Sequence, residues 1–459
     1  MRAAEKFWRT PSLLFVGVYL FSGLSRVATS FDSRWTVYTA MSLWTHGDLN
    51  LDEYGSAIRA NSYYALQCVD SEGRISLPAA GNCRGHWYHV YPMGGPILES
   101  PLIAGAVGAL RALGPVLGRI HGTGVIGGFL RGDYDAGHSL LEMEIASAMV
   151  AAAAVLLYWT ARRYLAPGRA VWLAALFGVA SPAYSIAGRA LWQHTPSLLL
   201  LTLILYLLTR AEDKPPLAAW AGIPVALSFT VRPTDALFVV VFTAYVAVRH
   251  RAHLFRYLMA AAPVALLFVV LDYRIYHSLL SPYYGTPFRS LDQWRVSATA
   301  LAGNLVSPSR GLLVFTPVFA FSIGSMLRRN WKAPLAPWLA ALALLQWIVI
   351  SCSDVYWWGG HSYGQRYFTD VVPVFTLFLI PYLEKWPLLP RPLRTAFVAL
   401  ALAGFAIHLR GGWSAAVYDW NVSPVNVDHA PQRVWDWSDP QFARAASAGR
   451  TPFPARPAP

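Results

Sequence analysis

The sequence predicts an all-α polytopic membrane protein with about eleven transmembrane helices. Of its 459 residues, 55% are hydrophobic and 13% are charged, whereas soluble proteins carry about 25% charged residues. Apolar stretches of about 16–24 residues recur along the chain, as a bilayer core requires. Lysine and arginine gather in the short loops between them, where they set orientation. The net charge of +13 is therefore assigned to membrane topology and not to nucleic-acid binding.

The apolar stretches define the expected spans. The first follows the basic residues Arg2, Lys6 and Arg9 and shows no evident small-residue cleavage site. It is therefore expected to be a retained signal-anchor. The spans are expected at 11–29, 138–160, 169–186, 195–210, 217–231, 234–249, 256–272, 311–327, 334–352, 368–386 and 393–408.

Five clusters of basic residues orient these spans. If all five lie on the inner side with the N-terminus, they alternate consistently with the polar loops. The predicted units are then a transmembrane domain at 1–410, which includes a large outer loop at 30–137, and an outer tail at 411–459. The clusters are Arg162, Arg163 and Arg169; Arg210 and Lys214; Arg249, Arg251 and Arg256; Arg328, Arg329 and Lys332; and Lys385, Arg391 and Arg394.

The first outer loop is predicted to carry juxtamembrane helices. Its segment 92–117 is apolar enough to span, but a single crossing would move every later basic cluster outside. We therefore expect this segment to lie along or dip into the outer interface, unless a second crossing lies in 118–137. Four prolines favour a broken interfacial helix over a straight span. They are Pro92, Pro96, Pro101 and Pro115.

Two of the three cysteines, Cys68 and Cys83, lie in the same loop. In an oxidising compartment they are expected to form a disulfide that closes a loop of about 15 residues and contributes roughly 3 kcal/mol. The alternative is a pair of free thiols.

Asp32 stands just past the first apolar segment, close to Arg34. An acid and an arginine at a membrane boundary are costly unless they pair, face water or take part in chemistry. We predict that Asp32 is a general base that takes the proton of an acceptor hydroxyl. The alternative is structural, either a salt bridge to Arg34 or an N-cap for a helix that begins near Trp35.

The candidate binding residues also fall in the predicted outer loops. Four of them are arginines near outer span ends, and guanidinium forks match the oxygens of a lipid phosphate. Singly, each arginine is as well explained by snorkelling or a structural ion pair. His86 and His89 have the spacing His-x-x-His and, with His194, suit sugar or phosphate hydrogen bonding more than a metal. The predicted binding set is Arg34, His86, His89, Arg189, His194, Arg232, Arg310, His361 and Arg366.

Three stretches resemble motifs of the GT-C superfamily of membrane glycosyltransferases, which includes protein O-mannosyltransferases and the lipid A aminoarabinose transferase. The run 31–34 looks like the catalytic first-loop aspartate of that superfamily. The run 87–96 is similar to the Pro-rich entry of its juxtamembrane helix. The run 228–234 looks like the break between two short helices, where a basic residue contacts the lipid phosphate in some members.

The resemblance covers most of the chain and implies a GT-C-like fold. The implied activity is transfer of a sugar from a polyprenyl-phosphate donor to a glycan, lipid or protein acceptor on the outer face. A single base, Asp32, fits inversion by direct displacement. The sequence departs from the superfamily at 189–194, where many members carry a second acid that some use for metal. A divalent metal is therefore not favoured, and no other cofactor is implied.

Two other functions stay open at this point. One is a transporter or flippase of lipid-linked saccharides, which would need ionisable residues near the bilayer midplane and inverted repeats. The other is a structural subunit of an envelope assembly complex. The protein is expected to lie in the bacterial inner (plasma) membrane, in contact with membrane lipid, with its site facing the periplasm.

Overall fold

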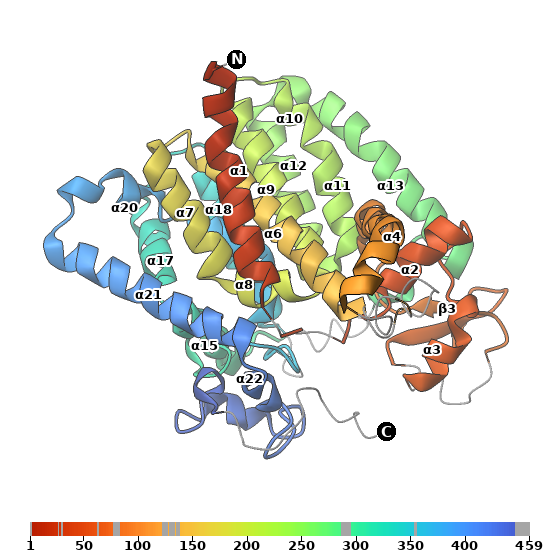
Figure 1. Ribbon diagram of the computed structural model, residues 1–459. Helices are drawn as coiled ribbons and strands as arrows, with labels where there is room; N and C mark the ends of the chain where they lie inside the picture. Colours follow the sequence, from red (N-terminus) through yellow and green to blue (C-terminus); the bar gives the residue numbers. More distant parts are fainter. Residues whose placement is uncertain are drawn as a thin grey trace.

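Helices build almost the whole protein in the computed structural model (Figure 1), with 69% of residues in helices and 3% in strands. The structure describes residues 2–25, 27–28, 31–61, 64–76, 83–121, 127, 134, 138–285, 295–352 and 356–445. In this part, six helical segments are long and apolar enough to cross a membrane: Gly94–Gly114, Ser139–Ala161, His194–Ala211, Arg251–Tyr276, Arg366–Glu384 and Arg391–Trp413. The predicted helical membrane-protein class is thus confirmed.

The elements follow one another as helices interrupted by one small sheet. The segments that follow the first helix are α2 (Thr36–Thr45), α3 (Gly55–Ala60), β1 (Leu66–Val69), β2 (Ile75–Ser76) and β3 (His86–His89). The other helices are α1 (Arg2–Gly23), α4 (Gly94–His121), α6 (His138–Ala161), α7 (Pro167–Val179), α8 (Pro182–Ser185), α9 (His194–Ala211), α10 (Leu217–Trp220), α11 (Gly222–Val231), α12 (Ala236–Arg249), α13 (Leu254–Tyr276), α14 (Pro282–Gly285), α15 (Ala298–Val306), α16 (Leu312–Phe315), α17 (Phe319–Arg328), α18 (Ala336–Ile350), α19 (Val372–Leu377), α20 (Ile380–Glu384), α21 (Arg391–Trp413) and α22 (Ala416–Asp419).

The count of about eleven crossing helices is not confirmed. Several predicted spans correspond to shorter helices, of 10 residues in α11 and α17, 14 in α12 and 15 in α18. A helix rises 1.5 Å per residue, so none of these alone crosses a bilayer core of about 30 Å. Several of them end at breaks such as the one between α11 and α12.

The expected break in segment 92–117 is wrong, because α4 runs without interruption over 28 residues. Pro96 lies in the first turn, where no backbone N–H is needed. Pro101 cannot donate to the carbonyl of Ile97, but the Ser100 hydroxyl donates to it instead at 2.9 Å. The carbonyl that proline leaves unpaired is thereby satisfied.

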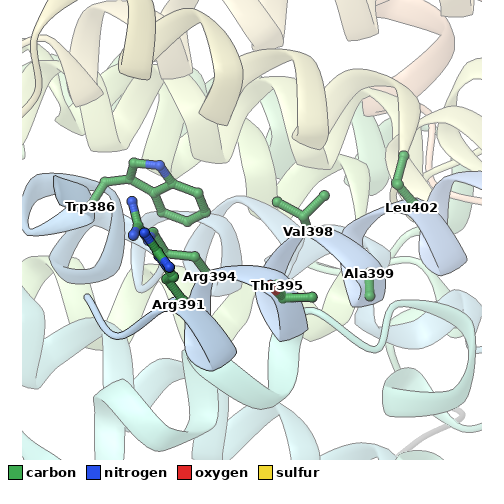
Figure 2. Close-up of a pocket in the computed structure, with 7 residues that line it drawn as sticks. All are labelled: Trp386, Arg391, Arg394, Thr395, Val398, Ala399 and Leu402. Carbon is green, nitrogen blue, oxygen red and sulfur yellow. The ribbon is translucent and has the colours of Figure 1, made fainter. Parts of the chain in front are cut away.

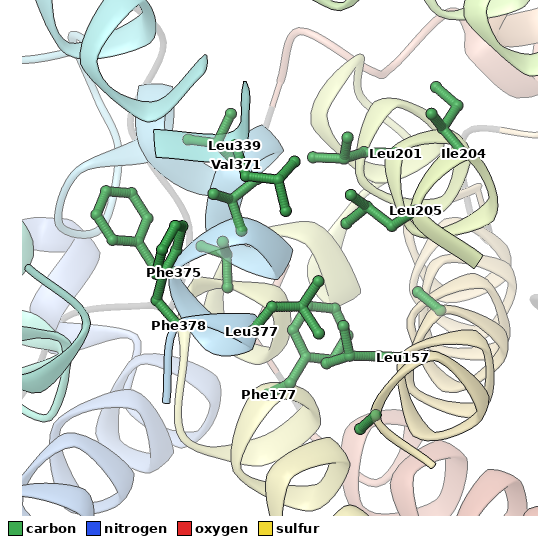
Figure 3. Close-up of a cluster of buried hydrophobic side chains, with 14 of the residues drawn as sticks. Leu157, Phe177, Leu201, Ile204, Leu205, Leu339, Val371, Phe375, Leu377 and Phe378 are labelled. Atoms are coloured by element: carbon green, nitrogen blue, oxygen red, sulfur yellow. The ribbon is translucent and has the colours of Figure 1, made fainter. Parts of the chain in front are cut away.

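The main hydrophobic core lies between α6, α7, α9, α18 and α19 (Figure 3). Leu157 on α6, Phe177 on α7, Leu201 on α9, Leu339 on α18 and Leu377 on α19 are fully buried there. The alanine run of α6 allows α1 and α9 to pack closely against it. Small residues promote such packing between helices in lipid, where dispersion contacts replace the hydrophobic effect.

A small antiparallel sheet of strand order β2-β1-β3 follows α3 and was not predicted from the sequence. A disulfide joins Cys68 on β1 to Cys83 just before β3, so the structure contains the bridge considered above. Gln67 on β1 donates to the Tyr276 hydroxyl of α13 at 2.8 Å. The sheet is therefore fixed to the helical bundle at the end of α13.

The C-terminal segment is ordered from residue 411 to 445 and packs on the loop before α16. Arg310 joins the two, because its buried guanidinium donates to Gln441 Oε1 at 2.7 Å and to Asn421 Oδ1 at 2.8 Å. Residues 446–459, the end of the predicted outer tail, lie outside the described residues.

One cavity of about 550 Å³ lies along the start of α21 (Figure 2). Trp386, Arg391 and Arg394 line one part of it, and Val398 and Leu402 continue along the same helix. None of the candidate site residues lines this cavity. Its position on a helix that is largely exposed is consistent with contact with lipid.

Candidate functional site

Asp32 is held by three segments that are distant in sequence. Its Oδ1 accepts a hydrogen bond from the Tyr64 hydroxyl at 2.7 Å. Its Oδ2 lies 3.1 Å from Arg366 Nη1. The backbone carbonyl of Asp32 lies 3.0 Å from His89 Nε2. Asp32 therefore forms an ion pair with Arg366, whereas the structural alternative expected an ion pair with Arg34. That alternative also considered an N-cap, but α2 begins at Thr36 with no side-chain cap.

The charge state of this group follows from its neighbours. Burial raises the pKa of Asp32, but the Arg366 guanidinium and hydrogen bonds from Tyr64 and Tyr91 outweigh it and bring the pKa below its usual value. Burial also lowers the pKa of His89 to about 4. His89 is therefore neutral at pH 7, and its Nε2–H donates to the Asp32 carbonyl. Asp32 is ionised and well oriented.

Arg366 begins a 3-10 helix, Arg366–Val371, and is flanked by aromatic rings. Its guanidinium lies 5.5 Å from the centroid of the Trp192 ring and 5.2 Å from that of Tyr367. Both separations fit cation–π contacts. Among the described residues, Arg366 Nε has no hydrogen-bond partner. The side chain is thus fixed in direction while one of its buried donors is unsatisfied.

A second charged cluster surrounds Asp370, which is 0% exposed. Its Oδ1 lies 2.7 Å from His194 Nδ1, and its Oδ2 lies 3.0 Å from Arg232 Nε. Arg232 Nη1 is in turn 3.2 Å from the His194 ring nitrogens. Arg232 and His194 are themselves 7% and 2% exposed. The buried Asp370 carboxylate therefore has a cation, Arg232, and a hydrogen-bonding histidine, His194, as the partners that a buried charge requires.

The helix break predicted at 228–234 positions Arg232. The helix α11 ends at Val231, Arg232 is extended with φ −151°, and Pro233 begins a short 3-10 turn before α12. Proline at this position prevents a continuous helix, since it disfavours helical geometry in the preceding residue. Asp235 in the same turn accepts a hydrogen bond from Ser197 at 2.6 Å. The break therefore places two ionisable groups beside α9.

Aromatic contacts join the two clusters into one site. Trp192 stacks edge-on against His194 at 4.9 Å, while it also flanks Arg366. On the other side, Tyr91 contacts Tyr283 at 5.4 Å. Tyr283 accepts a hydrogen bond from Gln193, the residue before His194, at 3.3 Å. We call this continuous set the Asp32–Arg232 cluster. It comprises Asp32, Tyr64, His89, Tyr91, Trp192, His194, Arg232, Tyr283, Arg366, Tyr367 and Asp370.

The sequence reasoning missed Asp370 and gave Asp235 no role. Asp370 was assigned to the interior of a span at 368–386, although it follows Arg366 by one helical turn. Asp235 likewise follows Arg232 by three residues. An arginine with an acid one turn later, at the start of an apolar helix, is the signal that points to these residues.

Four other predicted binding residues lie outside the cluster. Arg310 is committed to the C-terminal segment, as described above. His361 lies 2.9 Å from Asn426 and 3.5 Å from Asp428, on the same segment. Arg189 is fully buried beside α1 and α6, where it donates to Ser22 Oγ and Ser147 Oγ. Arg34 lies close enough to Glu142 of α6 to interact with its charge.

The two histidines of the His-x-x-His motif face opposite ways. Residues three apart on a strand point to opposite faces. His86 is exposed and lies 2.6 Å from Asp52, whereas His89 is buried against Asp32. The pair therefore cannot share one ligand. Among the described residues, no group of three or more His, Cys, Asp or Glu side chains is placed to hold a metal ion.

Residues 360–364 read Gly-His-Ser-Tyr-Gly, which matches the pattern of a hydrolase nucleophile. Ser362 is fully buried, and its hydroxyl donates to the Gly364 carbonyl at 3.3 Å. No strand precedes it and no helix begins at it, so the turn that exposes such a serine is missing from this described loop. We therefore assign Ser362 no chemistry.

The fold and the site define an integral membrane protein whose charged residues converge at helix breaks. Residues 136–274, less than one third of the chain, match the family described as dolichyl-phosphate-mannose-protein mannosyltransferase, which belongs to the GT-C superfamily. The match confirms the resemblance to that superfamily, and the family implies a membrane glycosyltransferase that uses a polyprenyl-phosphate-linked sugar. The matched segment includes His194 and Arg232 but neither Asp32 nor Arg366. No curated protein and no solved structure matches the chain.

Proposed function

We propose that the protein transfers a sugar from a polyprenyl-phosphate donor to a glycan, lipid or protein acceptor at the outer face of the bacterial inner membrane. The observation that carries the proposal is the 3.1 Å contact between Asp32 and Arg366, which lie 334 residues apart in the chain. It brings a candidate base and a candidate phosphate ligand into one site. A structural subunit would not need this combination.

Arg366 and Arg232 are the proposed ligands of the donor phosphate. Their guanidinium groups lie 5.2 Å and 5.8 Å from the centroid of the same ring, that of Tyr367. Both cations are therefore neighbours of one aromatic ring, which they reach from two different helix ends. A guanidinium fork matches phosphate oxygens and stays charged beside lipid. Fixed positive charge at this point stabilises the negative charge that develops on the phosphate as it leaves.

Asp32 is the proposed general base. The acceptor hydroxyl attacks the anomeric carbon of the sugar while Asp32 takes its proton. The bond from that carbon to the phosphate oxygen breaks, and the polyprenyl phosphate leaves with the bonding electrons. Because one displacement occurs, the anomeric configuration inverts. The hydrogen bonds from Tyr64 and His89 orient the carboxylate for this step.

The variant Asp32→Asn tests the base. It keeps the shape and hydrogen-bonding capacity of the side chain but cannot accept the proton. Turnover with a polyprenyl-phosphate mannose donor is expected to fall by roughly 10²–10⁴, the usual contribution of a positioned base. The yield of folded protein is expected to stay at the wild-type value. Full activity in a well-folded variant would remove Asp32 from the mechanism.

A transporter or flippase of lipid-linked saccharides is the second candidate function. The buried ionisable set of His194, Arg232, Asp235 and Asp370 favours it, because such groups among apolar helices mark substrate or ion pathways. Vesicles that contain the protein and a labelled donor separate the two functions. A flippase moves the intact donor between leaflets, whereas the transferase converts it to free polyprenyl phosphate when an acceptor is present.

A further inference from the structure

We propose that Arg366 is exchanged between Asp32 and the donor phosphate, so that binding of the donor releases the base that the reaction needs. This inference rests on the proposed function, since it concerns regulation of the same site. The structure links base and phosphate ligand directly, through Asp32 Oδ2 and Arg366 Nη1. While that contact persists, the carboxylate is a weak proton acceptor.

The ion pair between Asp32 and Arg366 is suited to exchange. Their side chains are 22% and 19% exposed, whereas those of Asp370 and Arg232 are 1% and 8% exposed. The Asp32–Arg366 pair is therefore less deeply enclosed than the Asp370–Arg232 pair, and its replacement by another partner costs less. A phosphate with several oxygens is a stronger acceptor for a guanidinium fork. Within the described residues, Arg366 Nε is buried and has no hydrogen-bond partner, so the present pairing with Asp32 leaves this donor unsatisfied.

Asp32 keeps its position when Arg366 leaves it. The Tyr64 hydroxyl binds Oδ1, the oxygen that Arg366 does not contact. His89 binds the main-chain carbonyl and fixes the backbone. The exchange therefore removes the cation from Asp32, while the hydrogen bonds from Tyr64 and Tyr91 stay in place. The carboxylate then accepts the proton of the acceptor hydroxyl without a competing positive charge.

Loss of Arg366 from the pair makes Asp32 a better base. The groups that face Asp32 are Tyr64, His89, Tyr91, Tyr283 and Arg366. Of these five, only Arg366 is a cation at pH 7. When the donor phosphate pairs with Arg366, Asp32 loses a counter-ion and gains an anionic neighbour. Both changes raise the pKa of the Asp32 carboxyl group. A carboxylate of higher pKa takes up a proton more readily.

The exchange also sets the order of the reaction steps and restores the starting state after each turnover. The donor must bind before the acceptor can be deprotonated. After transfer, the proton is on Asp32, and the electrons of the broken carbon–oxygen bond are on the polyprenyl phosphate. Its added negative charge holds Arg366 until the lipid leaves. Asp32 then loses its proton to solvent and recovers Arg366.

The affinity of Asp32→Asn for the donor tests the exchange. A carboxamide does not compete as an anion for Arg366, so the variant is expected to bind a short-chain polyprenyl-phosphate mannose about fivefold or more tightly than wild type. The matched control is Asp70→Asn, which removes the carboxylate from another aspartate–arginine pair, with Arg74 at 3.0 Å, outside the site. Its donor affinity is expected to equal that of wild type.

The outcomes separate this inference from the proposed function. If wild type binds and transfers the sugar while Asp32→Asn binds the donor no better, the exchange is wrong and the function stands. If wild type neither binds the donor nor transfers the sugar, the proposed function itself fails.

A pH profile of donor affinity gives a second measurement that needs no change at Asp32. Since the donor raises the pKa of Asp32, affinity must increase as pH falls through the pKa of the complex, and level off below the pKa of the free protein. The sugar phosphodiester keeps its charge over this range. Between about pH 7 and about pH 4, the slope is expected in wild type and is expected to be smaller in Arg366→Gln, where only the negative charge of the donor still raises the pKa of Asp32. A flat wild-type profile, or the same slope in both proteins, would overturn the exchange.

Discussion

Each arginine of the proposed phosphate site is paired with a carboxylate of the same chain, and the two pairs differ in burial. Arg232 and Asp370 are enclosed between helix ends, whereas Arg366 and Asp32 lie closer to the surface. Removal of one partner from a buried pair leaves an uncompensated charge, which costs about 3–5 kcal/mol. A fully exposed pair contributes about 0–1 kcal/mol, and the partly exposed pair of Asp32 and Arg366 falls between these limits. The inner pair is therefore expected to contribute more to stability than the outer pair.

This difference predicts the effect of Asp370→Asn on stability. The variant removes the carboxylate that contacts the buried Arg232 guanidinium, so the free energy of unfolding should fall by about 3–5 kcal/mol. Thermal unfolding in detergent measures the change. The control is Asp428→Asn, which alters a carboxylate that is 29% exposed and paired with His361. A wild-type melting temperature in Asp370→Asn would show that the inner pair contributes no stability.

Donor affinity tests the two arginines directly. Arg232→Ala and Arg366→Ala should each weaken donor binding by about 1.5–3 kcal/mol, the contribution of a charge-assisted hydrogen bond. Lysine at either position should restore only part of the affinity, because the planar fork is lost. Titration of the folded variants with a polyprenyl-phosphate mannose provides the measurement. If both alanine variants bind like wild type, the phosphate lies elsewhere.

The sequence identified part of the candidate site and left the rest open for a physical reason. Asp32, Arg232 and Arg366 were selected because charged groups at span ends are costly without a role, and the structure gathers them. Arg310 has the same position relative to a span, yet it binds the C-terminal segment. Which loop a distant segment covers depends on tertiary packing. The periodicity of one stretch of sequence does not contain that information.

At the scale of elements, the start of α4 and the end of α11 meet at the break that holds Arg232. Gly94 makes this contact possible, since a Cβ on it would lie 2.3 Å from the Thr230 carbonyl oxygen. The hydroxyl of Tyr284 on α14 donates to the same carbonyl at 3.0 Å. Three elements thus fix the position of one helix end. The predicted break located this point, whereas the continuity of α4 depended on Ser100 and was not foreseen.

Gly94→Ala tests the contact between α4 and α11. The added methyl group must displace backbone and not a flexible side chain, so the variant should lose about 1–3 kcal/mol of stability together with transfer activity. Gly95→Ala is the matched control, because a Cβ at Gly95 meets nothing within 4 Å. Melting temperature and turnover should fall only in Gly94→Ala. Equal behaviour of the two variants would mean that α4 and α11 adjust freely.

At the scale of the whole molecule, orientation is the main expectation left to measure. The basic clusters place the N-terminus inside and both the first loop and the C-terminal segment outside. Ser71 and Ser438 lie in these two regions and are exposed in the structure. Cysteines introduced at both positions should react with a membrane-impermeant reagent in intact cells with a permeable outer layer. Labelling of either one only after lysis would reverse the assigned topology.

The contact between Arg310 and the C-terminal segment has a practical consequence for anyone who shortens or tags this protein. Its guanidinium makes five hydrogen bonds, to Ser309, Trp358, Gly360, Asn421 and Gln441. Deletion of the chain from residue 411 onward would remove two of these acceptors, Asn421 and Gln441. It would also expose the charged, buried guanidinium of Arg310 to solvent. An affinity handle joined after residue 445 leaves every one of them in place. The safe limit for trimming is therefore set by Gln441, far beyond the last apolar helix.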